Sequence, residues 1–240
     1  MGNERNPIQM APQVRSQSRA NYEWIMKQSE DRKLQDVIAY PGYLRSESLL
    51  SNGTQRIDFA ITEGQLIDGQ TVGNTEQRLK QNDAFFIERI GVVLIPVDLG
   101  AGVAGTPGTQ LQRAVARPQH FPSAFAFAAN EDSANAFWNG GKLTITQNEK
   151  IYCRDLDLYT MQYADTAQES ATVRSALDYS RAFQAVTDPM FRLNGQSNVE
   201  CSIQLPASLN FTQEANVSVY AGIIFKGWRA QNAGVARVAQ

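Results

Sequence analysis

The sequence predicts an all-β protein, a single antiparallel sandwich of eight strands with an N-terminal arm and one helical insertion. Apolar and polar residues alternate in successive runs from about residue 54 onward, and residues 199–205 show this best, with every odd position apolar. A period of two places one face of a strand on a core and the other in water. The chain of 240 residues also has one histidine, the residue on which most metal and acid–base chemistry relies.

Charge and composition exclude several classes of protein. The net charge is −2, so no general basic field is available to hold a polyanion, and we expect weak or no direct nucleic-acid binding. We find neither an N-terminal apolar signal nor an apolar stretch near 18 residues, which predicts no secretion signal and no membrane span. Cys153 and Cys201 have no metal-binding spacing and are expected to be buried free thiols, with a disulfide as the alternative.

The first 50 residues are predicted to be a flexible arm followed by a helix. Residues 1–20 lack periodicity and carry three arginines against one glutamate, which is typical of a disordered segment. From residue 21 to 38 the apolar positions fall mostly at helical spacing, and Pro41 and Gly42 supply a stop. We therefore expect an arm and helix over 1–50, a sandwich over 51–230 and a tail over 231–240.

Eight runs with strand-like pattern make up the predicted sandwich. They cover residues 57–61, 85–97, 121–128, 142–147, 151–163, 190–193, 199–205 and 217–228. The second run is nearly continuously apolar, as expected for a strand covered on both faces. A capping box from Thr166 to Glu169 predicts the helical insertion, which should extend to about residue 186 and end before Pro189.

Two sequence patterns resemble catalytic motifs. Residues 100–105 fit G-x-G-x-x-G, but Pro107 and Gly108 follow where a dinucleotide-binding turn needs a helix, so we expect a loop. Asp155 and Asp157 should project from one sheet face, as in sandwich glycosidases, which generally need a further acid nearby. A solvated strand end or a subunit contact is favoured for this pair.

The single histidine, His120, lies between prolines and is expected in a loop or an interface. One histidine cannot build a two-histidine metal site within one subunit. The sequence therefore predicts no catalytic, cofactor-binding or metal-ligating residue, no cofactor, and a protein that is not an enzyme.

The remaining candidates are aromatic and apolar residues that could mediate contacts between subunits. Aromatic residues near an arm or at strand ends more often anchor interfaces than stack ligands. The predicted interface residues are Tyr22, Trp24, Ile25, Met26, Trp138 and Trp228.

Eight antiparallel strands, a flexible arm and long insertions, without a catalytic constellation, are typical of a jelly-roll coat protein. Residues 53–59, residues 75–87 and Phe191-Arg192-Leu193-Asn194-Gly195 are similar to segments in capsid proteins of small tailless and unclassified bacteriophages. This resemblance, over about residues 45–228, implies a structural virion protein that is assembled in the host cytoplasm into an icosahedral shell around the genome. It implies copies of the chain as partners, with other virion proteins as further partners, and no catalytic residue carries over.

Two other classes of protein remain open. A glycan-binding module, or a phage receptor-binding head, would share the sandwich and present exposed aromatic side chains beside acids on one face. A sandwich glycosidase would require the aspartate pair to be catalytic.

Overall fold

A computed structural model describes residues 12–31, 36–65, 76–98, 131–161, 184–185, 190–209 and 217–233. Most of these residues lie in strands. Within these ranges the elements are α1 (Pro12–Asp31), β1 (Ile38–Leu49), β2 (Arg56–Phe59), β3 (Ala84–Asp98), α2 (Glu131–Gly140), β4 (Lys142–Gln147), β5 (Lys150–Asp157), the 3-10 helix η3 (Leu158–Met161), β6 (Gln184–Ala185), β7 (Phe191–Asn194), β8 (Val199–Gln204) and β9 (Val217–Gln231).

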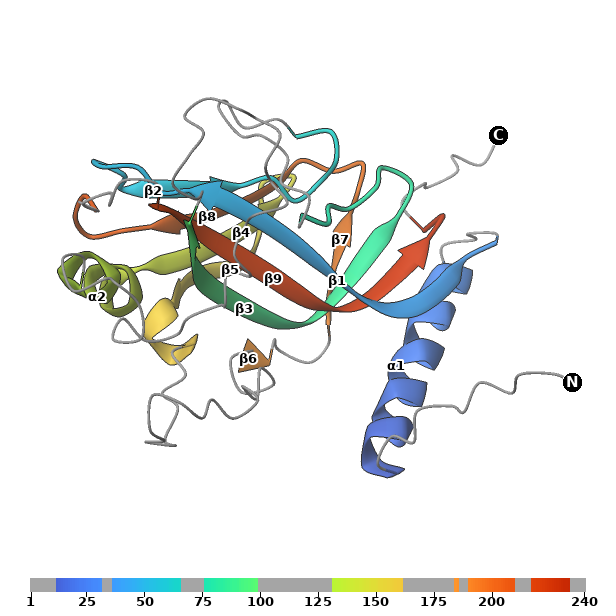
Figure 1. Cartoon of the computed structure of the whole chain (residues 1–240). Coiled ribbons are helices and arrows are strands. Elements are labelled where there is room, and N and C mark those ends of the chain that lie inside the picture. The colour runs from blue at the N-terminus through green and yellow to red at the C-terminus, as the bar shows by residue number, and fades with distance from the viewer. Residues whose placement is uncertain are drawn as a thin grey trace, which may run out of the picture.

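The strands form two antiparallel sheets that face each other (Figure 1). The first sheet has the order β1-β9-β3-β6, and β7 also pairs with β3. The second sheet has the order β2-β8-β4-β5. Every pairing between these strands is antiparallel. The all-β antiparallel sandwich expected from the period-two runs is therefore confirmed.

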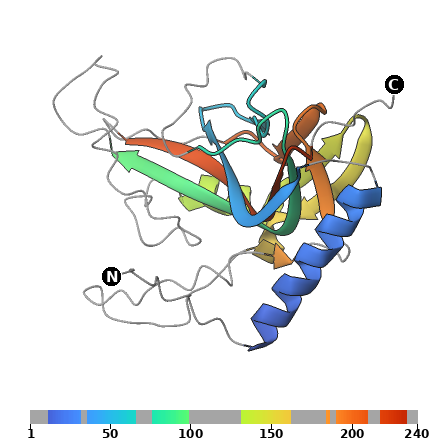
Figure 2. The same ribbon diagram turned by 90° about the vertical axis from the view of Figure 1, so that its right-hand side faces the viewer.

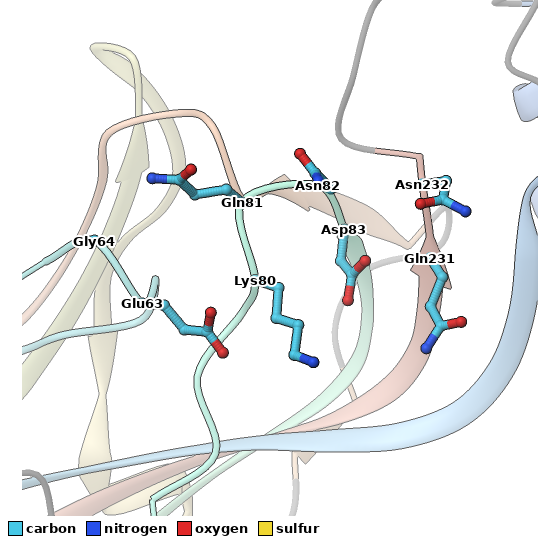
Figure 3. A pocket seen from close by; sticks show the side chains of 8 residues that line it. All are labelled: Glu63, Gly64, Lys80, Gln81, Asn82, Asp83, Gln231 and Asn232. Carbon is cyan, nitrogen blue, oxygen red and sulfur yellow. The ribbon is translucent and has the colours of Figure 1, made fainter.

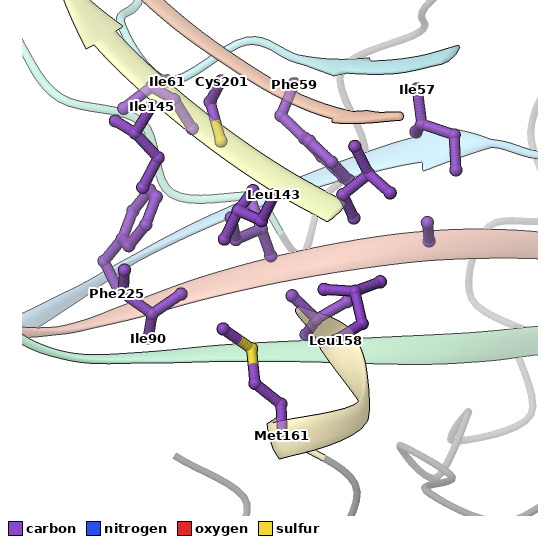
Figure 4. Packing of buried hydrophobic residues seen from close by; sticks show 14 of the residues in the cluster. Ile57, Phe59, Ile61, Ile90, Leu143, Ile145, Leu158, Met161, Cys201 and Phe225 are labelled. Atoms are coloured by element: carbon purple, nitrogen blue, oxygen red, sulfur yellow. The ribbon is translucent and has the colours of Figure 1, made fainter. Parts of the chain in front are cut away.

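The core lies between the two sheets and is built from the inward positions of both (Figure 4). In β8, residues Val199, Cys201 and Ile203 are buried and alternate with exposed or half-buried polar residues. Across the core, Phe225 of β9 and Ile90 of β3 are also buried, at 0% and 1% exposed. Burial of such side chains from both sheets is the main favourable contribution to the stability of the fold.

The two helices lie at opposite ends of the sandwich, as Figure 1 shows. At one end α2 packs Phe137 and Trp138 into the core, with their rings edge to face at 5.2 Å between centroids. Gly141 joins α2 to the second sheet: its N–H donates to the Phe137 carbonyl, and its own carbonyl accepts from Leu158 of η3. At the other end α1 packs against the outer face of the first sheet (Figure 2).

Six of the eight predicted strands coincide with strands of the structure, with small differences at their ends. The run 151–163 is wrong at its C-terminal end, because β5 stops at Asp157 and a 3-10 helix follows. The Asp157 carboxylate accepts a hydrogen bond from the backbone N–H of Tyr159, which is the interaction of a helix cap. The predicted strand at 121–128 lies outside the described residues.

The expectation for residues 21–38 is wrong at both ends. The helix α1 begins at Pro12 and ends at Asp31, and residues 38–49 form the strand β1. Proline suits the first turn of a helix, because its φ is already helical and its missing N–H is not needed there. Residues 12–20, expected in the flexible arm, are therefore helical, and β1 is a strand that the sequence did not predict.

Part of the predicted helical insertion is also corrected. Residues 184–185 form a short strand beside β3 rather than the end of a helix, and residues 166–183 lie outside the described residues. The helix α2 was not predicted at all.

Candidate assembly surface

The outer face of the first sheet carries a small apolar cluster that seats α1. Ala84 and Phe86 of β3 lie opposite Ala230 and Trp228 of β9 in the strand register, and all four are buried. Ile25 of α1, which is 0% exposed, packs into this cluster. The two alanines leave room for the helix to approach the sheet closely.

Aromatic pairs flank this contact on both sides. Trp24 meets Phe86 edge to face at 5.6 Å between ring centroids, and Tyr22 lies 6.2 Å from Trp228 at a tilt of 51°. Such arrangements contribute beyond the area they bury. The rings of Phe86 on β3 and Trp228 on β9 are buried, whereas Trp24 is half-buried and Tyr22 is 41% exposed. The seat of α1 is therefore closed at its centre and open to solvent at its rim.

A β-bulge places a carboxylate between α1 and the sheet. The register between β3 and β9 shifts between Ile87 and Arg89, so Glu88 is an extra residue without a partner on β9. Its Oε1 accepts from the indole N–H of Trp228 at 2.9 Å and from the side-chain amide of Asn21 on α1. Glu88 thereby joins the helix, the bulge and β9 in one hydrogen-bonded group.

Gly227 allows β9 to lie close to the backbone of β3 beside the bulge. It lies opposite Ile87 in the register, and a Cβ at this position would be 1.9 Å from the carbonyl oxygen of Phe86. Any side chain here would displace the backbone of β3. Sequence reasoning missed Glu88, although the pair Glu88-Arg89 is the one charged interruption in the apolar run of β3 before Asp98.

The apolar rim of this surface continues onto β1. Pro41 lies opposite Trp228, and Tyr43 opposite Lys226, on the same outer face. Both residues are exposed, Tyr43 to 51%. Together with Tyr22 they form an apolar rim along the side of α1.

The structure brings five of the six predicted interface residues together. Tyr22, Trp24, Ile25 and Met26 lie on α1, and Trp228 lies beneath them. Ile25 and Trp228 are buried against their own chain, while the other three are exposed or half-buried. Trp138 is different: it is 1% exposed and belongs to the core between the sheets, because α2 turns it inward.

A buried ionic cluster holds the segment before β3 against the first sheet. Arg78 pairs with Glu76 at 2.9 Å, and Arg229 of β9 lies 3.7 Å from Asp83. The side chains of all four are less than 10% exposed. Arg229 also donates to the backbone carbonyl of Arg78 at 2.6 Å. Charge-assisted bonds to a backbone carbonyl fix this segment and help to offset the cost of burying the charges.

A polar pocket of about 520 Å³ opens beside this cluster (Figure 3). Polar residues from a turn, from the loop before β3 and from the end of β9 line it: Glu63, Gly64, Lys80, Gln81, Asn82, Asp83, Gln231 and Asn232. The loop is held from behind, because Gly195 donates its N–H to the Asp83 carbonyl. The pocket lacks the apolar lining that most small-molecule sites have.

The aspartate pair lies at an irregular part of β5. Cys153 of β5 lies opposite Ile145 of β4, and Leu156 lies opposite Leu143. Between these pairs, two residues of β5, Arg154 and Asp155, oppose one residue of β4. Asp155, with φ of 52°, lies in this bulge. The bulge breaks the alternation of the strand, so Cys153 packs against the core while Asp155, two residues later, is exposed. Both aspartates are exposed.

Both cysteines are free thiols, as expected. Cys201 is buried, and Cys153 is half-buried rather than buried. The two lie on either side of Ile145 in the register, which places their Cα atoms about 9.6 Å apart, beyond the reach of a disulfide. Burial raises the pKa of both thiols, and raises that of Cys201 well above its ordinary value.

Other predicted features fall outside the described residues, namely the loop 100–105 and His120. Within the described ranges, His, Cys, Asp and Glu side chains form no group of three or more placed to hold a metal ion. No helix in the same ranges is both long enough and apolar enough to cross a membrane. A scan against models of known protein families finds no match to this chain, and neither does a search of the curated proteins.

Proposed function

We propose that this chain is a structural coat protein whose sandwich is a jelly roll and whose copies assemble into an icosahedral shell around a genome. The order of strand pairing carries this proposal. The first strand pairs with the last, β2 with β8, β3 with β7, and β4 with β5. Nested pairing of this kind is what results when one long antiparallel hairpin rolls up into two facing sheets, as in jelly rolls.

Counting strand positions supports the same topology. The short strands β6 and β7 pair with different parts of β3, at residues 89–90 and 84–87, and so occupy one position beside it. The nine strands found among the described residues then fill eight positions, four in each sheet, which is the number in a jelly roll. The likeness of three segments to phage capsid proteins points to a coat protein among the many uses of this fold.

In this proposal the protein has no catalytic step, and its partners are copies of itself and other proteins of the virion. A coat subunit needs surfaces that bind its own copies, and the apolar rim beside α1 is suited to that role. The rim combines exposed aromatic side chains with a rigid support, since Tyr22 rests on Trp228. Rigid aromatic residues of this kind are common at the centres of interfaces.

The test is the assembly state of the purified chain. Size-exclusion chromatography with light scattering, followed by negative-stain microscopy, should reveal large closed particles of uniform size. A chain that stays monomeric at high concentration, over a range of salt and pH, would contradict a coat function.

Contact with the genome should be weak in single subunits. Each neutralised phosphate contributes a salt slope of about 0.9 on duplex DNA, and a chain with a net charge of −2 can neutralise few. We expect no measurable DNA binding by free subunits at ~150 mM salt. Sub-micromolar binding that falls steeply with salt would instead indicate a protein that organises nucleic acid.

One observation favours glycan binding as a second candidate function. Tyr159 is 62% exposed, and its backbone N–H donates to the carboxylate of Asp157. Asp157 is exposed as well. An aromatic ring beside acids is a common arrangement for holding a sugar. Titration with a glycan library, followed by NMR or calorimetry, would detect such binding, and loss of the signal in Tyr159→Ala would locate it.

A further inference from the structure

The face of α1 that points away from the sheet carries four charged residues of alternating sign. Arg19, Glu23, Lys27 and Glu30 are all exposed, and at 3.6 residues per turn they lie within about 80° of arc. Ile25, which is buried in the seat, lies on the opposite side of the helix. Figure 2 shows α1 lying along one side of the sandwich. We call these four residues the outer stripe of α1.

The order of charges along the outer stripe is positive, negative, positive, negative. If a second copy of the helix lies alongside in the parallel sense, each charge meets its own sign. If it lies antiparallel, Arg19 meets Glu30 of the second copy and Glu23 meets Lys27 of the second copy. Two-fold symmetry repeats both contacts, so four ion pairs form from one self-complementary surface.

An apolar residue borders the same surface near its midpoint along the helix. Met26 is half-buried and lies about 20° outside the arc of the outer stripe, close along the axis to the point about which the antiparallel arrangement is symmetric. Tyr22 and Tyr43, which are 41% and 51% exposed, extend the apolar area at the side. Within the chain, Arg19 and Glu23 form an ion pair of 2.8 Å, yet their side chains remain 82% and 61% exposed. They are therefore available for further contacts.

Addition of strands at a sheet edge is the other common way for copies to associate. The backbone of Arg45 exchanges two hydrogen bonds with Gln77, which occupies that part of the β1 edge. Along an edge strand every second backbone N–H points away from the sheet, so position 41 points outward as Arg45 does. Residue 41 is proline and has no N–H there. The edge strand β5 is interrupted by register irregularities. These devices protect the edges at β1 and β5 against pairing and favour contacts made by side chains there.

We propose that two copies of this chain associate through their α1 helices, which pack antiparallel about a two-fold axis near Met26. This inference rests on the proposed function of self-assembly and names one contact that the assembly uses. Surface ion pairs are individually weak and are screened by salt. The contact is therefore expected to be reversible and to weaken as ionic strength rises.

The test uses two charge reversals that cannot affect each other within one helix. Arg19 and Glu30 are about 16.5 Å apart along α1. In a pair of Arg19→Glu chains, the new glutamate of each copy meets Glu30 of the other, so both contacts are repulsive. In a pair of Glu30→Arg chains, arginine meets arginine at the same two contacts. We expect each variant alone to associate at least about tenfold more weakly than the unmodified chain at low salt. An equal mixture should restore association, because both contacts are attractive in the mixed pair.

Sedimentation velocity and native mass spectrometry measure this directly, the second because the two variants differ in mass. Lys142→Glu, a reversal at an exposed position on the second sheet, is the matched control and should leave association unchanged. Circular dichroism should show that all variants are folded, since the four positions of the outer stripe are exposed.

The results separate this inference from the coat function. If the unmodified chain forms particles and both reversals do so equally well, the α1 contact is wrong and the coat function stands. If the mixture fails to restore association, the contact is also wrong. If mixing restores pairs but no variant or unmodified chain forms particles, the contact is correct and the coat function is wrong. A chain that never associates contradicts both.

Discussion

The outer faces of the two sheets differ in composition, although their inner faces are alike. On the first sheet, the outer positions near one end are alanine, phenylalanine and tryptophan, and α1 covers them. On the second sheet the outer positions are almost all polar and exposed or half-buried: Arg56, Asp58, Lys142, Thr144, Thr146, Glu200, Ser202 and Gln204. Ile151, at 50% exposed, is the apolar exception.

This difference shows what each sheet contributes to the protein. The second sheet has one apolar face and is complete once it meets the first. The first sheet has two apolar faces, so it needs a further covering element, and α1 supplies it for part of the outer face. Contacts that depend on apolar surface are accordingly concentrated on the first sheet and its helix.

The largest difference between the two faces should appear on truncation of an outer side chain. Trp228→Ala removes a buried ring and its hydrogen bond to Glu88, and should reduce the free energy of unfolding by about 3–5 kcal/mol. Thr146→Ala, at an outer position of the second sheet, should change it by less than about 0.5 kcal/mol. Urea unfolding measures both. Equal effects would show that the two outer faces are not energetically distinct.

A smaller effect is expected from the carboxylate under α1. Glu88→Ala leaves the Trp228 indole and the Asn21 amide without their acceptor, and should cost about 1–3 kcal/mol. Glu88→Gln keeps an acceptor oxygen and should cost less. Hydrogen exchange should locate the loss of protection in α1. The control is Glu200→Ala on the second sheet, and a loss as large there would contradict the role given to Glu88.

The smallest effect concerns the inner face of the second sheet. Because the pKa of Cys201 is raised in the folded state, its thiol stays neutral at a pH where the unfolded thiol ionises, above about 8.5. Stability is therefore fully present below that pH and falls as the pH rises beyond it. Cys201→Ala should flatten this dependence. Thiol reagents should modify the half-buried Cys153 first, and reaction of Cys201 in the folded protein would contradict its burial.

The period-two pattern predicted most strands because burial on one face imposes it. In β8 the alternation is complete, and in β3 the continuous apolar run correctly indicated cover on both faces. The strand β1 was missed because Pro41 and Gly42 indicate a stop. At the edge of a sheet a proline is tolerated when its nitrogen points away from the neighbouring strand, and that position cannot be known before the pairing is.

The candidate surface was predictable in its residues but not in its geometry. Tyr22, Trp24 and Trp228 were expected at contacts because aromatic residues near an arm or at strand ends often anchor interfaces. Nothing in the sequence indicated that the partner is their own sheet, since that depends on a register in which Phe86 meets Trp228. The role of Glu88 depends on a bulge and is equally non-local.

The place of β9 in the first sheet also determines when that sheet can form. The strand lies between β1 and β3, so β1 has no partner in the sheet, and β3 has only the short strands β6 and β7, until residues 217–231 have been synthesised and have left the ribosome. Pairings between such distant segments form slowly, since a long loop must close before they contribute. The seat of α1 contains Trp228 and Ala230, so it too is absent from a nascent chain. In a growing chain Tyr22 therefore lacks its Trp228 support. If copies bind each other through the apolar rim, as proposed, that contact should form only after synthesis is complete and not between neighbours on the same messenger.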